Sequence, residues 1–460
     1  MRPIAAALAI ILFTASPALA ATVAMADDPE HGCIVTLSGP IADGDTKALL
    51  SAIETASTGS RYADTIWYTD YGDGNPPDID FKTPLTLCLD SPGGSLAEAV
   101  RLTEAVHGRL GTMIRPGARC ESACALVFMA GGYDSASDAG IVTSRHLHVD
   151  GRLGFHAPSL SVPEGQYDAT TVARAYQVSV AATETIFRNL VRYRFPPSLA
   201  ARMHATPPSD MFYVSTVREA ARWGISVIGV DAPEAWTDAA IRTACHNLYR
   251  ATQDVVTSDP DQWSRGSASG APVRRGDNTF SYEGFGMEAA GTCEGYLSPA
   301  EEEYSSARQF WGPARAILAS IHAVASFPDA QPPLFFSFLQ SFMAYPGDMP
   351  LTSLPRGGVA TPVTDPGTCH VYTADDSLSD REPCTRTRQI KGDATLVTLF
   401  DWPSGARTVL ETAGMTRRIN GQPARGWYWP EPRPATASDT DCARNEVSGN
   451  VFCFHPSGGS

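Results

Sequence analysis

The feature that most constrains the fold of this chain is its set of ten cysteines, all of which lie after residue 20. Residues 1–20 combine a short positive start, an apolar run and a final Ala-Leu-Ala, the pattern of a secretory signal peptide cleaved after Ala20. A membrane anchor is the alternative, but it needs about 20 apolar residues and Pro17 interrupts the segment. We therefore expect a periplasmic or secreted protein with no membrane span after cleavage.

The cysteines are expected to form disulfides, because thiols are not kept reduced in an oxidising compartment. Cys245 and Cys293 lie on either side of a polar, glycine-rich stretch, so we expect them to pair. Two further pairs are expected near the C-terminus, Cys369 with Cys384 and Cys442 with Cys453. The full set of disulfide candidates is Cys33, Cys88, Cys120, Cys124, Cys245, Cys293, Cys369, Cys384, Cys442 and Cys453.

A chain of 460 residues is too long for one ordinary core, so several domains are expected. Four follow the signal peptide. They are an α/β domain over 21–235, a small helical, disulfide-linked module over 236–327, a proline-rich linker over 328–367, and a small all-β domain over 368–460.

Alternating short apolar runs and amphipathic segments support the first of these domains. Buried strands are predicted at Cys33–Leu37, Leu85–Leu89 and Thr112–Arg115, with a helix at Leu96–Leu110 between the last two. Apolar residues at helical spacing predict a long helix over Thr170–Tyr193. Strand, helix, strand at this pitch indicates βαβ units and an α/β layer.

The second half of the chain has a different pattern. Helices are predicted at Trp236–Thr252 and Ser298–Val324. In the proline-rich linker, one apolar stretch, Leu334–Tyr345, is a candidate to dock on a neighbouring domain. Beyond it, alternating runs around Asn420-Gly421 predict a β-hairpin and hence a small β module.

The net charge excludes one class of partner. The formal charge is −15 and the pI is about 5.1, whereas phosphate binding needs clustered Lys and Arg, so no nucleic-acid partner is expected. Arginine supplies nearly all the positive charge, since the only lysines are Lys47, Lys82 and Lys391.

Three segments have residues suited to catalysis. The first, from Leu87 to Ser95, is a buried strand followed by Pro-Gly-Gly and a helix, a turn that can expose N–H groups to developing negative charge. The second sets Ser122 among small residues between a strand and an apolar helix, where serine is also a common helix cap. The third is Phe155-His156-Ala157-Pro158, where the histidine is either a core residue or a base.

Together, the three segments resemble the Clp protease catalytic subunit and its relatives in the Clp protease/crotonase-like superfamily. That family has N-S-P-G-G, then G-x-A-A-S-M-G-A-x-L-L-x-A-G around the nucleophile, then I-H-Q-P around the base. Here Ser122 stands nine residues before Gly131, as in the family pattern, and His156 fills the base position. The resemblance covers about residues 33–230.

The resemblance implies a ββα spiral fold and a serine hydrolase, and more specifically a peptidase acting on peptide or protein. Ser122 would be the nucleophile, His156 the base and Asp210 the acid, with the N–H groups of Gly94 and Ala123 as the oxyanion hole. No cofactor is implied. Relatives assemble into rings or domes, so a homo-oligomer is possible.

Two local alternatives remain beside these assignments. Cys120 and Cys124 flank Ser122 at a spacing that permits a bridge, and a thiol nucleophile is less favoured because export would tend to oxidise it. His146 and His148 could be metal ligands, but without a third ligand at diagnostic spacing a polar loop is favoured and no metal site is assigned.

Three other functions compete with this one. The signal peptide peptidase A family uses Ser with a Lys base, but only Lys47 and Lys82 lie in the relevant domain. Acyl-CoA chemistry of the crotonase type does not suit an exported chain. A catalytically inactive periplasmic binding or scaffold protein, with the C-terminal β module as its contact surface, is the alternative from a different class.

Overall fold

The structure of the protein is a computed structural model. The structure describes residues 21–28, 33–58, 85–134, 141–158, 165–231, 233, 236–252, 254, 271–275, 279–285, 291–296, 320–321, 337–338, 341–356, 362–391, 395–413, 416–427, 429–430 and 442–457. The predicted signal peptide, residues 1–20, lies outside the described residues. Among these described residues, strand residues outnumber helical residues, at 41% against 28%.

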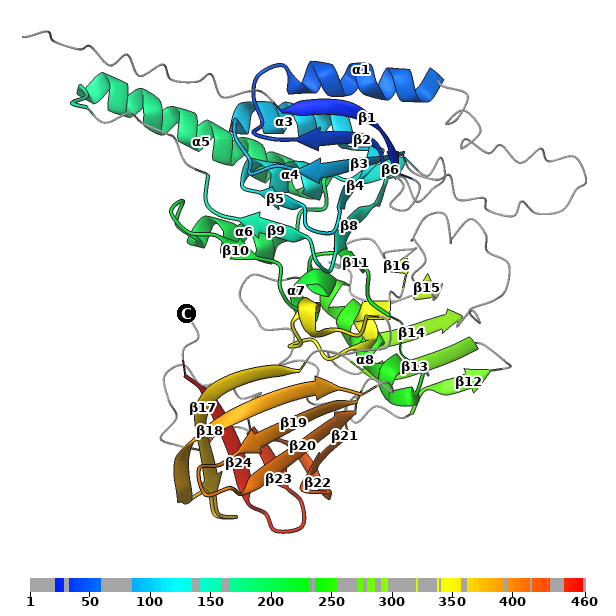
Figure 1. Ribbon diagram of the computed structural model, residues 1–460, viewed down its shortest axis with the longest axis vertical. Helices are drawn as coiled ribbons and strands as arrows, with labels where there is room; N and C mark the ends of the chain where they lie inside the picture. The colour runs from blue at the N-terminus through cyan, green and yellow to red at the C-terminus, as the bar shows by residue number, and fades with distance from the viewer. Residues whose placement is uncertain are drawn as a thin grey trace, which may run out of the picture.

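The first half of the chain contains an eight-stranded mixed sheet with helices packed on it (Figure 1). Its parallel strands are β2 (Cys33–Ser38), β3 (Leu85–Asp90), β4 (Arg109–Ile114), β8 (Arg145–His148) and β11 (Ser226–Ile228). Its antiparallel strands are β1 (Thr22–Asp28), β6 (Gly132–Asp134) and β7 (Ile141–Thr143). The predicted polar loop around His146 and His148 is therefore partly sheet, since β8 pairs with both β4 and β11.

In the described part of this half of the chain, six helices accompany the sheet. They are α1 (Asp45–Thr58), α3 (Leu96–Val106), α4 (Ala123–Met129), α5 (Ala169–Arg192), α6 (Pro197–Ala205) and α7 (Val217–Arg222). Helix α3 begins after Ser95, whose side chain accepts a hydrogen bond from the N–H of Glu98, and it buries Leu102 and Val106 in the core. Helix α5 extends well beyond the sheet (Figure 1).

A second, three-stranded sheet lies beside α4. It has the order β10-β9-β5, with β5 (Arg119–Glu121) parallel to β9 (Arg152–Phe155) and β10 (Phe212–Tyr213) antiparallel to β9. The ring of Phe155 is buried and stacks on that of Phe212, with centroids 5.5 Å apart. This packing fixes the end of β9, after which His156 follows.

The expected helical module over 236–327 is wrong as a fold. Helix α8 (Asp238–Thr252) is present, but it is followed by an antiparallel sheet of β12 (Val273–Arg275), β13 (Thr279–Phe285) and β14 (Gly291–Tyr296). The predicted helix Ser298–Val324 lies mostly outside the described residues, and its Ser320–Ile321 forms strand β15, paired with β16 (Ser337–Phe338). The prediction rested on helical periodicity on either side of a polar, glycine-rich stretch. Such periodicity does not report on the pairing of strands within that stretch.

Within the range 328–367, where proline content indicates an extended linker, residues 341–356 fold into two short 3₁₀ helices, η2 (Ser341–Ala344) and η3 (Leu351–Ser353). Phe342 and Tyr345 are buried in the same core cluster as the N-terminal strands. The N–H of Val217 donates to the carbonyl of Met349 at 3.0 Å, which ties this segment to α7.

The C-terminal region is a closed barrel of eight antiparallel strands (Figure 1). The strands are β17 (Val363–Tyr372), β18 (Leu378–Ile390), β19 (Leu396–Asp401), β20 (Arg407–Ala413), β21 (Thr416–Ile419), β22 (Gln422–Trp427), β23 (Cys442–Asn445) and β24 (Val451–Pro456). Each strand pairs with the next, and β24 pairs with β17 to close the barrel. Closure leaves no free sheet edge.

The barrel and the strand content overturn the predicted fold class. We expected an α/β chain with a ββα spiral domain of the Clp protease/crotonase-like type, followed by small helical and β modules. The mostly-β composition and the closed barrel indicate a different fold. Alternation predicted strands near the C-terminus, but the pairing of β17 with β24 joins residues far apart in sequence and leaves no local pattern.

Five disulfides join all ten cysteines, so the prediction of a disulfide-containing protein is confirmed. The pairs are Cys33–Cys88, Cys120–Cys124, Cys245–Cys293, Cys369–Cys384 and Cys442–Cys453. Among the described residues, no helix is both long enough and apolar enough to span a membrane.

Candidate active site

Ser122 occupies a strained backbone conformation at a turn between a strand and a helix. Strand β5 ends at Glu121, α4 begins at Ala123, and Ser122 between them has φ 56° and ψ −123°. A positive φ is unusual for a residue with a Cβ and costs of order 1–3 kcal/mol, so it persists only where the surroundings impose it. The side chain of Ser122 makes no helix-capping hydrogen bond and is half-buried. The common structural role of a serine at this position, capping the helix, is therefore not fulfilled.

The Pro-Gly-Gly turn packs directly against Ser122. A Cβ added to Gly93 would lie 2.7 Å from the Cβ of Ser122, and one added to Gly94 would lie 2.2 Å from the carbonyl oxygen of Ile41. Both glycines have positive φ, 94° and 146°. Only glycine fits this turn, because any side chain would collide with neighbouring backbone. The Pro-Gly-Gly turn was recognised from the sequence, but a role was predicted only for Gly94 and none for Gly93.

Two backbone N–H groups are left without acceptors at this turn. Within the described residues, neither the N–H of Gly94 nor that of Ala123 donates a hydrogen bond. Ala123 is the first residue of α4, where N–H groups have no partner inside the helix. Such groups can stabilise an anion, so they are suitable donors for an oxyanion.

His156 follows the strand next to Ser122. The N–H of Ser122 donates to the carbonyl of Gly154 on β9 at 3.0 Å, and His156 is two residues beyond that carbonyl. Because β5 and β9 are parallel and Glu121 pairs with Gly154, Ser122 and His156 both follow the same end of these two neighbouring strands.

The ring of His156 has a defined tautomer. Its Nδ1 lies 2.7 Å from the carbonyl oxygen of Ala157. A carbonyl only accepts hydrogen bonds, so the proton belongs on Nδ1 and Nε2 has the free lone pair. That tautomer can accept a proton from a serine hydroxyl.

Asp210 lies two residues before β10, which pairs with β9. Its side chain is exposed, and its backbone N–H donates to the carbonyl of Pro207 at 2.9 Å. Among the described residues, no hydrogen bond joins Asp210 to His156, whose Nδ1 pairs with Ala157 instead. The role of Asp210 as the acid stays a prediction.

A polar network that sequence analysis missed holds the three strands of this small sheet together. Glu121, the residue before Ser122, is buried and accepts from Nη2 of Arg152 on β9 at 2.6 Å and from the hydroxyl of Tyr213 on β10 at 3.1 Å. Burial and the adjacent Glu121 raise the pKa of the Tyr213 phenol, so the phenol remains a donor. Glu121 and Tyr213 are 92 residues apart, so no local motif could reveal their contact.

Cys120 and Cys124 bracket Ser122. Their disulfide spans four positions, from β5 across the turn into α4. The bridge closes the turn covalently, and it removes both thiols as candidate nucleophiles because a disulfide sulfur has no thiolate form. The sequence left the bridge open as one of two possibilities.

The other candidate groups lie elsewhere. Lys47, one of the two candidates for a lysine base, is exposed on α1, and Lys82 lies outside the described residues. His146 is buried, its Nε2 lies 3.1 Å from Oγ of Ser144, and burial lowers its pKa to about 4. Among the described residues, no group of three or more His, Cys, Asp or Glu side chains could hold a metal ion.

The structure therefore places Ser122 and Ala123 against the Pro-Gly-Gly turn, sets His156 after the strand that neighbours β5, and leaves Asp210 exposed. A serine hydroxyl and an imidazole base of this kind can together carry out nucleophilic attack on a carbonyl group. No protein-family model and no curated protein sequence matches this chain.

Proposed function

We propose that this protein is an exported serine hydrolase, specifically a peptidase, with Ser122 as its nucleophile. The observation that supports this most strongly is the backbone of Ser122, with φ 56° and ψ −123°, at a sharp strand-to-helix turn. A turn of this kind presents a serine hydroxyl at the start of a helix, beside free N–H groups, in other serine hydrolases. A glycine would adopt this backbone conformation with less strain, so the turn itself does not require a serine at position 122.

In the proposed reaction, Nε2 of His156 takes the proton of the Ser122 hydroxyl as Oγ attacks the substrate carbonyl. The N–H groups of Gly94 and Ala123 bind the resulting oxyanion, each contributing about 3–4 kcal/mol to transition-state stabilisation. His156 then donates its proton to the leaving group as the carbonyl re-forms. Water, deprotonated by His156, hydrolyses the acyl-enzyme and restores the Ser122 hydroxyl.

The protonated imidazole needs a partner during this cycle. The carbonyl of Ala157 fixes the tautomer of His156 in the resting structure. Asp210 is the proposed acid, and Asp210→Asn tests it: labelling of Ser122 by a serine-reactive probe falls by several orders of magnitude if the carboxylate is required. Unchanged labelling would assign the third position to Ala157 alone.

The site is proposed to work outside the cytoplasm, in the periplasm or as a secreted protein, after cleavage at Ala20. Five disulfides support export, because such bonds persist in oxidising compartments. N-terminal sequencing of the protein from its native compartment tests the cleavage site, with Ala21 expected as the first residue.

The direct test of the activity is labelling by an alkyl fluorophosphonate, which reacts with activated serines. Wild-type protein should be labelled, Ser122→Ala should not be labelled, and His156→Ala should be labelled far more slowly than wild type. Circular dichroism of each variant separates loss of the site from loss of the fold. A protein that is folded but not labelled in its wild-type form would instead be a binding or scaffold protein.

A further inference from the structure

A pocket lined by basic side chains lies at the far end of α4 from Ser122. Helix α4 begins at Ala123 and the chain reaches the pocket at Gly131, so about 10 Å of helix separates the two sites. The pocket has a volume of about 180 Å³. Its lining includes His107, Tyr193 and three arginines, Arg145, Arg192 and Arg194, and no lining residue is Asp or Glu.

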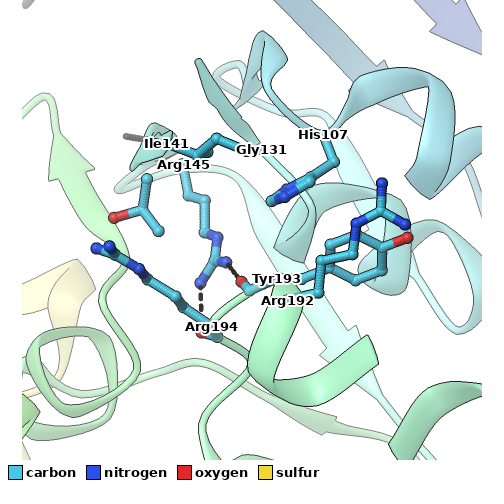
Figure 2. Close-up of a pocket in the computed structure, with 8 residues that line it drawn as sticks. His107, Gly131, Ile141, Arg145, Arg192, Tyr193 and Arg194 are labelled. Carbon is cyan, nitrogen blue, oxygen red and sulfur yellow. Dashed lines mark hydrogen bonds between the residues drawn. The ribbon is translucent and has the colours of Figure 1, made fainter. Parts of the chain in front are cut away.

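Arg145, on β8, is the central group of this pocket. Its residue is only 2% exposed. Figure 2 shows its guanidinium directed toward the carbonyls of Tyr193 and Arg194, the ring of His107 on the other side of the pocket, and the side chains of Arg192 and Arg194 running outward in opposite directions. Burying a guanidinium is costly unless it is paired, so the position of Arg145 calls for a compensating charge.

The partners of Arg145 are neutral. Its Nη2 donates to the carbonyl of Tyr193 and its Nη1 to the carbonyl of Arg194, the latter at 3.4 Å. Arg194 has a positive φ of 47°, a strained conformation at the end of α5 beside these two carbonyls. The buried Nε of Arg145 has no hydrogen-bond partner among the described residues.

The charges around the pocket repel one another. Among the described residues, no salt bridge involves Arg145, Arg192 or Arg194. Burial, and then Arg194, lowers the pKa of Arg145 to about 9, so it remains charged at neutral pH. Burial and then Arg192 lower the pKa of His107. These groups would all be stabilised by a single anion placed among them.

We propose that the pocket between α3, β8 and the end of α5 is a binding site for a small oxyanion, a phosphate or carboxylate group, held by Arg145 with help from Arg192 and Arg194. A guanidinium binds such groups through paired N–H donors, and Arg145 uses two of its five N–H groups on carbonyls. The site is separate from Ser122 and does not depend on the hydrolase proposal.

The test is titration calorimetry of the full mature chain with inorganic phosphate and, separately, with acetate, at constant ionic strength set by chloride. One equivalent of either anion should bind. Tighter binding of phosphate identifies a phosphate group as the ligand chemistry, and tighter binding of acetate identifies a carboxylate. Absence of binding by both would overturn the proposal.

Variants locate the binding. Combined Arg192→Gln and Arg194→Gln should weaken binding about tenfold or more, and Arg145→Lys should weaken it further because the paired donors are lost. Arg188→Gln, an exposed arginine of the same helix, is the matched control and should bind as wild type does. If Arg145→Lys fails to fold, the double variant decides; equal binding by the double variant, the control and wild type would assign the anion to another site.

Discussion

The turn at Ser122 and the C-terminal barrel both contain non-glycine residues with positive φ, and they use them differently. In the barrel, Asp376 and Asn420 lie in turns between adjacent strands. Asn420 also joins its turn to the neighbouring strand β20, since its side chain accepts from the N–H of Val409 at 2.8 Å. Ser122 joins a strand to a helix, and its side chain makes no capping bond. The strained residues of the barrel form turns between strands, whereas the strained backbone of Ser122 is not offset by a side-chain hydrogen bond. This difference favours a functional role for Ser122.

The disulfides differ in the same way. In the barrel, Cys369–Cys384 joins neighbouring strands β17 and β18, and Cys442–Cys453 joins β23 and β24. Cys120–Cys124 closes a loop of only four positions around Ser122. Cross-linking a short loop removes little conformational entropy from the unfolded chain, so this bridge stabilises the fold only modestly. Its main effect is to fix the shape of the turn.

The largest expected contrast is between His156 and His370, a buried histidine of the barrel. His156→Ala should lower the rate of fluorophosphonate labelling by about 10²–10⁴-fold, because general-base catalysis is lost. His370→Ala should leave that rate unchanged, although it removes a ring packed against Trp429. Labelling kinetics of both variants make the measurement. Slow labelling of the His370→Ala variant, or labelling of the His156→Ala variant at the wild-type rate, would contradict the assignment of His156 as the base.

The disulfides should separate stability from activity. Replacing Cys369 and Cys384 by alanine should lower the free energy of unfolding by about 3 kcal/mol, and replacing Cys120 and Cys124 by about 2 kcal/mol, from loop entropy. The order for labelling should be the opposite: about ten- to a hundredfold slower without the bridge at Ser122, and unchanged without the bridge in the barrel. Denaturant unfolding and labelling rates, measured on the same samples, check both. Equal labelling of the two variants would mean that the turn needs no clamp.

The acidic residues Glu121 and Glu411 provide the next comparison. Glu121 is buried and bonded to Arg152, whereas Glu411 forms a more exposed ion pair with Lys391 in the barrel. Glu121→Gln should cost about 1–2 kcal/mol, a value reduced because Arg152 is largely exposed, and Glu411→Gln less than about 0.5 kcal/mol. Urea unfolding of both variants measures this difference. A loss at Glu411 as large as that at Glu121 would contradict the positioning role of the Glu121 network.

The smallest effects concern the positive-φ residues themselves. Ser122→Gly should be about 1 kcal/mol more stable than Ser122→Ala, because glycine relieves the backbone strain. Asn420→Gly should instead be about 1 kcal/mol less stable than wild type, because the side-chain hydrogen bond to Val409 is lost. Thermal and urea unfolding should show these opposite signs. If Ser122→Gly were the less stable of its pair, the strain argument would fail.

Local features of this chain could be predicted from sequence, and long-range ones could not. The strand expected at Cys33–Leu37 is β2, Cys33–Ser38, and the helix expected at Thr170–Tyr193 is α5, Ala169–Arg192, because apolar periodicity reports on a single element. Barrel closure between β17 and β24 depends on pairing across most of the domain. Hence the fold class was wrong while individual elements were found.

The candidate site divides in the same way. Ser122, His156 and the glycine turn were identifiable because each belongs to a short motif. The network from Glu121 to Tyr213 and the pocket around Arg145 were not, since their members come from separate elements that meet only in the folded chain. The positive φ of Ser122 is likewise a tertiary property, imposed by packing against Gly93.

The central claim, that Ser122 is an activated nucleophile, is tested most directly by mapping the fluorophosphonate adduct on the oxidised wild-type protein by peptide mass spectrometry. One adduct per chain, on the peptide that contains Ser122 and its flanking Cys120–Cys124 bridge, is the predicted result. An adduct on another hydroxyl, or none on a protein shown to be folded with its five disulfides intact, would contradict the claim.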